Sequence, residues 1–220
     1  MKQISFPALD SQKLYAGIQE IEEYKRSHQV SELLFHLYCG VSDKEQVSNV
    51  ADALMLRFPE AKIVGLSSYG EIDKGKMIRQ DILVSALLFS SSTVQIITCR
   101  NLKGHEGERS KKLSETINAI PDVRAVEVIV RSDQIDGISA FLGLSHCNPD
   151  IKIFGGVPIG HDIANDDRMI YTKEEISGDI MVAILYCGKD LFVDADKTAG
   201  WERLGHAFTV TDADGMHELR

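Results

Sequence analysis

The chain has 220 residues, of which 44% are hydrophobic, and a formal net charge of −9 at pH 7. A chain of this length and apolar content can bury the core of one large domain or two small ones, so disorder is not expected. The acidic balance, with no block of basic residues, argues against binding to a nucleic-acid backbone, which needs clustered lysine and arginine.

The first half of the sequence predicts two helices. A cap at Asp10 or Ser11 begins the first helix, because the apolar residues after it recur at helical spacing. Ser42 and Glu45 have the spacing of a capping box, which predicts the start of the second helix. Pro59 ends that helix, since proline removes a backbone donor and restricts the residue before it.

The same half predicts several strands, which lie over residues 33–38, 63–66, 81–89 and 94–99. The last two are expected to be a pair joined by a turn of three serines at 90–92. The order of helices and strands then begins again with a helix around Leu113 and Ile117, a strand over 125–130, and a helix capped near Ser132 or Asp133.

Two short patterns recur in the second half in the same order. Residues 59–65 and 149–155 both have the pattern P-acid-x-K-I-x-G, and residues 81–84 align with 179–182. The sequence therefore predicts an internal repeat, roughly 10–100 and 108–196. We expect an α/β fold of two αβαβββ-like halves whose mixed sheets are covered by helices, with a four-layer αββα order as one arrangement.

Two glycine-containing loops leave the equivalent strands of these halves. They are "GLSSYGEI" at 65–72 and "GGVPIGHD" at 155–162, and a symmetric packing would turn both toward one crevice. Either loop alone also fits a tight corner that needs glycine. The candidate ligand-binding residues are Gly65, Ser67, Ser68, Tyr69, Glu71, Gly155, Gly156, Val157, His161 and Asp162.

These residue types suit an amino acid, which offers a carboxylate and an ammonium group. Backbone N–H groups at the glycines and the two serine hydroxyls could bind the carboxylate, while Glu71 or Asp162 could bind the ammonium group. Tyr69 and Val157 would contact the side chain. A Ser68 hydroxyl that waits for a ligand would leave folding almost unchanged when removed.

Motifs for catalysis, nucleotides and metals do not fit. The pattern G-x-S-x-x-G at 65–70 is one residue longer than a nucleophile elbow. In the second loop, His161 and Asp162 replace the lysine and hydroxyl residue of a P-loop, and an EF-hand counted from Asp162 would place Lys173 where a glutamate is required. We expect no cofactor and no metal. A hydrolase that uses Ser67 or Ser68 with His161 remains an alternative.

The location of the protein is predicted from what its segments lack. The N-terminal residues contain no continuous apolar segment of a signal peptide, and the apolar runs at 82–89 and 180–187 are too short to span a bilayer. The four cysteines have no C-x-x-C spacing, which is typical of reduced thiols. We therefore expect a cytoplasmic protein without membrane insertion or disulfides.

Four phrases in order resemble one family. "GLSSYGEI", "IFGGVPIGHD", "GDIMVAILYCG" and the phrase from Gly200 to Gly205 that leads into 208–211 resemble the FIST (F-box and intracellular signal transduction) N-terminal sensory domain family. The sequence departs from the family pattern in two places. Leu66 stands where cysteine is common, and Pro158 lies in the second loop.

The resemblance implies a signal-input module and not an enzyme. It implies a ligand-sensing domain over 1–196 and the start of a truncated FIST C-terminal region over 197–220. Its ligand would be a small molecule such as an amino acid. Its partners would be the FIST C-terminal domain and an attached output such as a diguanylate cyclase, histidine kinase or chemoreceptor. A ligand-free interaction or dimerisation domain is a second alternative.

Overall fold

The computed structural model describes residues 1–131, 136–160 and 168–194, and beyond them residues 205, 209, 211, 213–214 and 218–219. In this part of the chain the helices are α1 (Ser11–Ser27), α2 (Lys44–Arg57), α3 (Glu106–Ala119) and α4 (Gly137–Leu144). The strands are β1 (Lys2–Pro7), β2 (Glu32–Cys39), β3 (Lys62–Ser67), β4 (Glu71–Asp73), β5 (Lys76–Ile78), β6 (Ile82–Phe89), β7 (Thr93–Arg100), β8 (Val123–Val130), β9 (Lys152–Gly156), β10 (Ile170–Thr172), β11 (Ile176–Ser177), β12 (Ile180–Cys187), β13 (Ala213–Asp214) and β14 (Glu218–Leu219).

Most of the strands form two larger sheets. The first sheet has the order β1-β6-β2-β3-β10-β11 and the second has the order β7-β12-β8-β9, while β4–β5 and β13–β14 are separate hairpins. Strands β2 and β3 run parallel, as do β8 and β9, and the other neighbours in the two larger sheets run antiparallel. The mixed α/β fold that the sequence predicts is therefore confirmed.

The second sheet has the same order and directions as the strands β1-β6-β2-β3 of the first. In each set one helix follows the first strand along the chain and another follows the second strand. Strands β6 and β12 begin at the positions that the sequence alignment pairs, and each has 8 residues. The internal repeat stays a prediction, which this shared order supports. The shared order places the boundary between the two halves between β6 and β7 instead of near residue 100.

Each of these two sets of strands and helices begins with a strand, and the predicted αβαβββ pattern lacks that first strand. Strand β1 precedes α1, and its side chains alternate in burial because Ile4 and Phe6 face the helices while Gln3 and Ser5 face the other side. Gly17 of α1 lies directly on Phe6, where a Cβ would come within 2.3 Å of the ring. The alternation in residues 2–7 was the signal for this strand.

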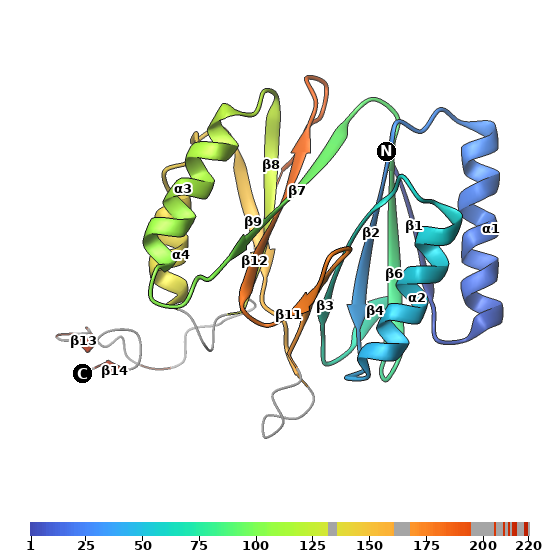
Figure 1. Ribbon diagram of the computed structural model, residues 1–220, viewed down its shortest axis with the longest axis horizontal. Helices are drawn as coiled ribbons and strands as arrows, with labels where there is room; N and C mark the ends of the chain where they lie inside the picture. The colour runs from blue at the N-terminus through green and yellow to red at the C-terminus, as the bar shows by residue number, and fades with distance from the viewer. Residues whose placement is uncertain are drawn as a thin grey trace.

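The two sheets lie face to face with helices on their outer sides (Figure 1). One buried cluster lies between α1, α2 and the first sheet, and another lies between α3, α4 and the second sheet. A third cluster lies between the sheets and includes Leu34 of β2 and Ile129 of β8. The four-layer order stays a prediction, which this arrangement supports.

Local signals place the first two helices. Asp10 caps α1 by accepting hydrogen bonds from the N–H groups of Gln12 and Lys13, as predicted. The predicted capping box at Ser42 is wrong by one residue, since Asp43 is the N-cap of α2 and accepts from the N–H of Glu45. Aspartate accepts this bond as well as serine, so either residue fits the pattern.

Two other local predictions are wrong. Strands β6 and β7 do not form a hairpin across the serine turn, because β6 belongs to the first sheet and β7 to the second. The N-cap of α4 is Asp136, which accepts from the N–H groups of Ile138 and Ser139. The predicted caps Ser132 and Asp133 lie outside the described residues.

No helix in the described part of the chain is long and apolar enough to cross a membrane. All four cysteines are free, which confirms that prediction: Cys39, Cys147 and Cys187 are buried, and Cys99 is half-buried.

Candidate functional site

Ser67 ends strand β3 and is buried. Its hydroxyl accepts a hydrogen bond from the N–H of Met169 over 3.1 Å, and its own N–H donates to the carbonyl of Met169 over 3.0 Å. Met169 directly precedes β10, so these bonds attach that edge strand to the end of β3. The Ser67 hydroxyl is therefore used within the fold.

Ser68 and Glu71 are next to each other across the turn that follows. The Ser68 hydroxyl donates to Oε1 of Glu71, whose side chain is buried. Gly40 makes room for this carboxylate, since a Cβ there would lie 3.0 Å from both of its oxygens. Burial and then the nearby charge of Glu71 raise the pKa of the Cys39 thiol to about 12. The hydroxyl of Ser68 thus already has a partner, contrary to the expectation that it waits for a ligand.

The other two predicted residues of the first loop have different surroundings. Gly65 is buried in the middle of β3, and a Cβ there would come within 2.9 Å of the Cβ of Leu37 on β2. Its role in the structure is close packing. Tyr69 is exposed, and its ring lies 5.2 Å from the guanidinium carbon of Arg79.

The second predicted loop begins inside a strand. Gly155 and Gly156 belong to β9 and pair with Val128 and Ile129 of β8. Gly155 has a φ of 155°, and a Cβ there would lie 1.9 Å from the carbonyl oxygen of Val128, so glycine is required by the backbone. Val157 is exposed. His161 and Asp162 lie outside the described residues.

Where both loops are described, they meet at one backbone contact. The N–H of Ile159 donates to the carbonyl of Ser67 over 3.0 Å. The second loop therefore passes the end of β3. In the described part of the chain, however, Gly155, Gly156 and Val157 do not line the cavity that contains Ser68 and Glu71.

That cavity, which we call the loop cavity, has a volume of about 630 Å³ and is lined by Tyr38, Ser68, Glu71, Asp73 and Lys74, among others. It brings acids and a cation together. Asp73 accepts a hydrogen bond from the hydroxyl of Ser5 over 2.6 Å. Lys74 makes no ion pair with the described residues.

A second cavity lies between the two sheets beside the loop cavity. This inter-sheet cavity has a volume of about 480 Å³, and it shares Gln3, Tyr38 and Ser85 with the loop cavity. Its buried side contains His36 of β2, Glu127 of β8 and Tyr186 of β12. His36 occupies the face of β2 that Leu34 also occupies, because alternate residues of a strand share a face.

Glu127 is the centre of a buried polar cluster. Its Oε2 lies 3.0 Å from Nε2 of His36 and accepts a hydrogen bond from the hydroxyl of Tyr186 over 2.6 Å. Burial raises the pKa of Glu127, but the hydrogen bond and charge of His36 and the hydroxyl of Tyr186 outweigh burial, so its pKa is below the ordinary value. Burial and the charge of Glu127 raise the pKa of Tyr186.

Sequence reasoning missed this cluster and Lys74. Glu127 stands alone in the apolar run AVEVIV, and His36 lies within the equally apolar strand β2. A charged residue in a strand of this kind is costly to bury without a partner, so each was a signal for the other. Lys74 follows the predicted loop and gave no such signal.

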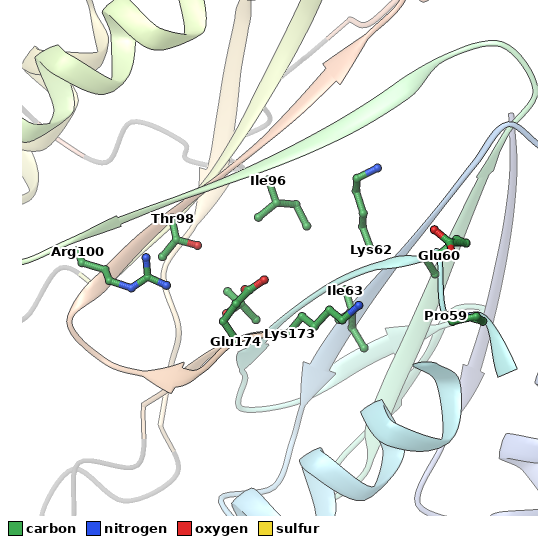
Figure 2. A pocket seen from close by; sticks show the side chains of 11 residues that line it. Pro59, Glu60, Lys62, Ile63, Ile96, Thr98, Arg100, Lys173 and Glu174 are labelled. Atoms are coloured by element: carbon green, nitrogen blue, oxygen red, sulfur yellow. The ribbon is translucent and has the colours of Figure 1, made fainter. Parts of the chain in front are cut away.

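A third cavity lies at the other edge of the sheets. It has a volume of about 560 Å³, and Figure 2 shows its lining residues, which come from β3 and the residues just before it, from β7, and from the end of β10 and the residues that follow. Two of its three basic side chains are already paired, since Lys62 contacts Glu32 and Arg100 contacts Glu175. This balance makes it a weaker candidate for a ligand than the other two cavities.

The geometry does not favour a serine nucleophile. The hydroxyl of Ser67 is bound to Met169, that of Ser68 is bound to Glu71, and neither contacts a histidine among the described residues. A hydroxyl nucleophile needs a base within hydrogen-bond reach. Among the described residues, no group of histidine, cysteine and acidic side chains is placed to bind a metal ion.

Comparison with known proteins adds one match. The model of the FIST N domain family matches residues 33–219. No protein with a curated description matches the chain. The match runs through most of the segment that the sequence assigns to a FIST C-terminal region, so that division stays a prediction.

Proposed function

Because this match covers most of its length, the chain belongs to the FIST N domain family, and we propose that it binds an amino acid in the loop cavity. The FIST N domain is a family of sensory domains in signal transduction. The finer part of the proposal concerns the ligand and the residues that bind it.

The observation that carries the proposal is the charge of the loop cavity. Glu71 and Asp73 line it together with Lys74, and Ser5, Ser68 and Ser85 also line it. An amino acid carries both an ammonium group and a carboxylate, and it needs an acid and a separate donor group at a fixed spacing. Glu71 would bind the ammonium group and Lys74 would bind the carboxylate, while the hydroxyl of Ser68, which donates to Glu71, would hold that acid in place.

The remaining predicted residues have smaller parts in this proposal. Tyr69 would contact the ligand side chain, while Gly65 would pack β3 against β2 and Ser67, Gly155 and Gly156 would shape the ends of their strands. Val157, His161 and Asp162 of the second loop stay candidate ligand contacts, of which His161 and Asp162 lie outside the described residues.

The proposed consequence of binding is a signal to an attached output. A ligand can shift an equilibrium only by the difference in its affinity for the two states. Binding between the end of β3 and the β4–β5 hairpin would favour one arrangement of that hairpin. We propose that a FIST C-terminal domain relays this change of arrangement, in the cytoplasm, to an output such as a diguanylate cyclase, histidine kinase or chemoreceptor.

A thermal-shift screen tests this proposal. Each protein amino acid is added in turn at millimolar concentration, and the melting temperature is measured. A ligand at 100 times its Kd adds about 2.7 kcal/mol to stability, which is a rise of about 5–10 °C for a domain of this size. A screen in which no amino acid raises the melting temperature contradicts the proposal.

The ligand-free alternative has one observation in its favour. Helix α4 exposes Ile138, Phe141 and Leu142. Exposed apolar side chains on one helix are common at interfaces. Sedimentation velocity of the chain separates the ligand-binding function from the interaction function. If the chain dimerises through α4, the wild type should sediment as a dimer and Leu142→Lys as a monomer.

A further inference from the structure

We propose that the inter-sheet cavity is a second binding site, for a small organic cation with an ammonium group and a short apolar body. This inference goes beyond the proposed function, because the amino acid would occupy the loop cavity. It rests on the carboxylate of Glu127, on the aromatic rings around it and on the apolar entrance of the cavity.

Contacts to one of its two oxygens hold the carboxylate of Glu127 in place. Both His36 and Tyr186 contact Oε2, and no hydrogen bond to Oε1 comes from the described part of the chain. The side chain of Glu127 is 15% exposed, whereas that of His36 is 4% exposed. A carboxylate fixed by two partners loses little freedom when it accepts a third donor, and a cationic donor makes the strongest such bond.

Aromatic rings form the walls beside this carboxylate. Tyr186 stacks on Phe154 with ring centroids 6.2 Å apart, and it packs against Phe89 at 6.1 Å in a tilted arrangement. Tyr38 lines the same cavity from β2. The faces of aromatic rings attract cations, and an ammonium group among several rings is a recurrent form of recognition.

The polar end and the entrance of the cavity favour the same ligand. Glu127 lines it together with its partner His36, Met1 lies at the same cavity, and no lysine or arginine side chain of the described residues lines it. Phe154 is 39% exposed and Phe192 is 85% exposed, so the entrance is apolar while the buried end holds the carboxylate of Glu127. A ligand with an ammonium group at one end and an apolar body at the other matches this gradient.

Calorimetric titration in an amine-free phosphate buffer tests the inference. The probes are phenethylamine, its neutral analogue 2-phenylethanol and the anion 3-phenylpropionate. Phenethylamine is expected to bind at least tenfold more tightly than either analogue. Equal binding of the amine and the alcohol would overturn the inference, because the carboxylate would then contribute nothing.

Two variants locate the binding. Glu127→Gln keeps an acceptor for His36 and Tyr186 but removes the charge, and it is expected to weaken phenethylamine at least tenfold. Phe154→Leu keeps an apolar side chain at the exposed wall and is expected to weaken it about two- to fivefold. Ser68→Ala in the loop cavity is the matched control and should bind phenethylamine as the wild type does.

The variants also separate this inference from the proposed function. Loss of amino-acid binding in Ser68→Ala with unchanged phenethylamine binding supports two sites. Melting curves check that each variant is folded at the titration temperature. If Glu127→Gln does not fold, Phe154→Leu decides, and wild-type affinity in that variant overturns the inference.

Discussion

His36 and Glu127 join the two sheets through a polar contact, with Nε2 and Oε2 3.0 Å apart between strands β2 and β8. The pair is largely buried, and Tyr186 donates to the same oxygen. This contact lies on the inner face of both sheets, beside apolar side chains such as Leu34 and Ile129.

The first prediction is that this contact makes stability depend on pH. The pKa of Glu127 is lowered in the folded chain, so its contribution is present above the ordinary value of 4.5 and is lost as the pH falls through the folded value. The unfolding free energies of wild type and Glu127→Gln should differ most near neutral pH, and the gap should close at acidic pH. A gap that stays constant from neutral to acidic pH contradicts the assignment.

The second prediction separates two serines. Ser67→Ala leaves the buried N–H of Met169 without its acceptor and should cost about 1–3 kcal/mol of unfolding free energy. Ser42→Ala is the matched control, because Ser42 is exposed and Asp43 caps the helix, so its change should stay within about 0.5 kcal/mol. Denaturant unfolding measures both. An equal effect of the two changes would show that the Ser67 bond contributes nothing.

The third prediction compares adjacent glycines in β9. Gly155→Ala places a Cβ against the carbonyl oxygen of Val128 at a φ that other residues rarely adopt, so it should cost about 1–3 kcal/mol or more. Gly156→Ala meets nothing within 4 Å and should be nearly neutral. Thermal melts of both variants check this. Equal stability of the two variants would be inconsistent with the pairing of β9 on β8.

The fourth prediction concerns thiol reactivity. Burial and the charge of Glu71 raise the pKa of Cys39 to about 12, whereas Cys99 is only half-buried. Iodoacetamide reacts with the thiolate, so in the native protein Cys99 should be labelled first and Cys39 last. Mass spectrometry after a time course identifies the order, and unfolding without reductant should expose all four thiols. Early labelling of Cys39 contradicts its buried position.

The sequence predicted the elements better than their partners. Apolar periodicity placed the first three helices and most strands of the two sheets, because each depends on a local pattern. The serine turn could not show that β6 and β7 belong to different sheets, since the same turn suits a hairpin or a crossover. Asp43 and Ser42 are equally good caps, so only the structure identifies the one that is used.

The site was predicted only in part, because local patterns show candidate residues but not their distant partners. The loop after β3 was found from its glycines and hydroxyls, and the structure does place Ser68 and Glu71 at a cavity. The partner of Glu127 is 91 residues away in the sequence, so the local pattern can show that Glu127 needs a partner but not which residue supplies it. Gly155 was assigned to a ligand, but its backbone conformation already requires glycine.

The most direct test of the central claim is calorimetric titration of the amino acid that raises the melting temperature most. It is titrated into wild type, Glu71→Gln, Lys74→Gln and the control Glu60→Gln, which removes the same charge from an exposed residue at the third cavity. We predict that Glu60→Gln binds as the wild type does and that Glu71→Gln and Lys74→Gln each bind at least tenfold more weakly. Undiminished binding in both loop-cavity variants would contradict a ligand site between these residues.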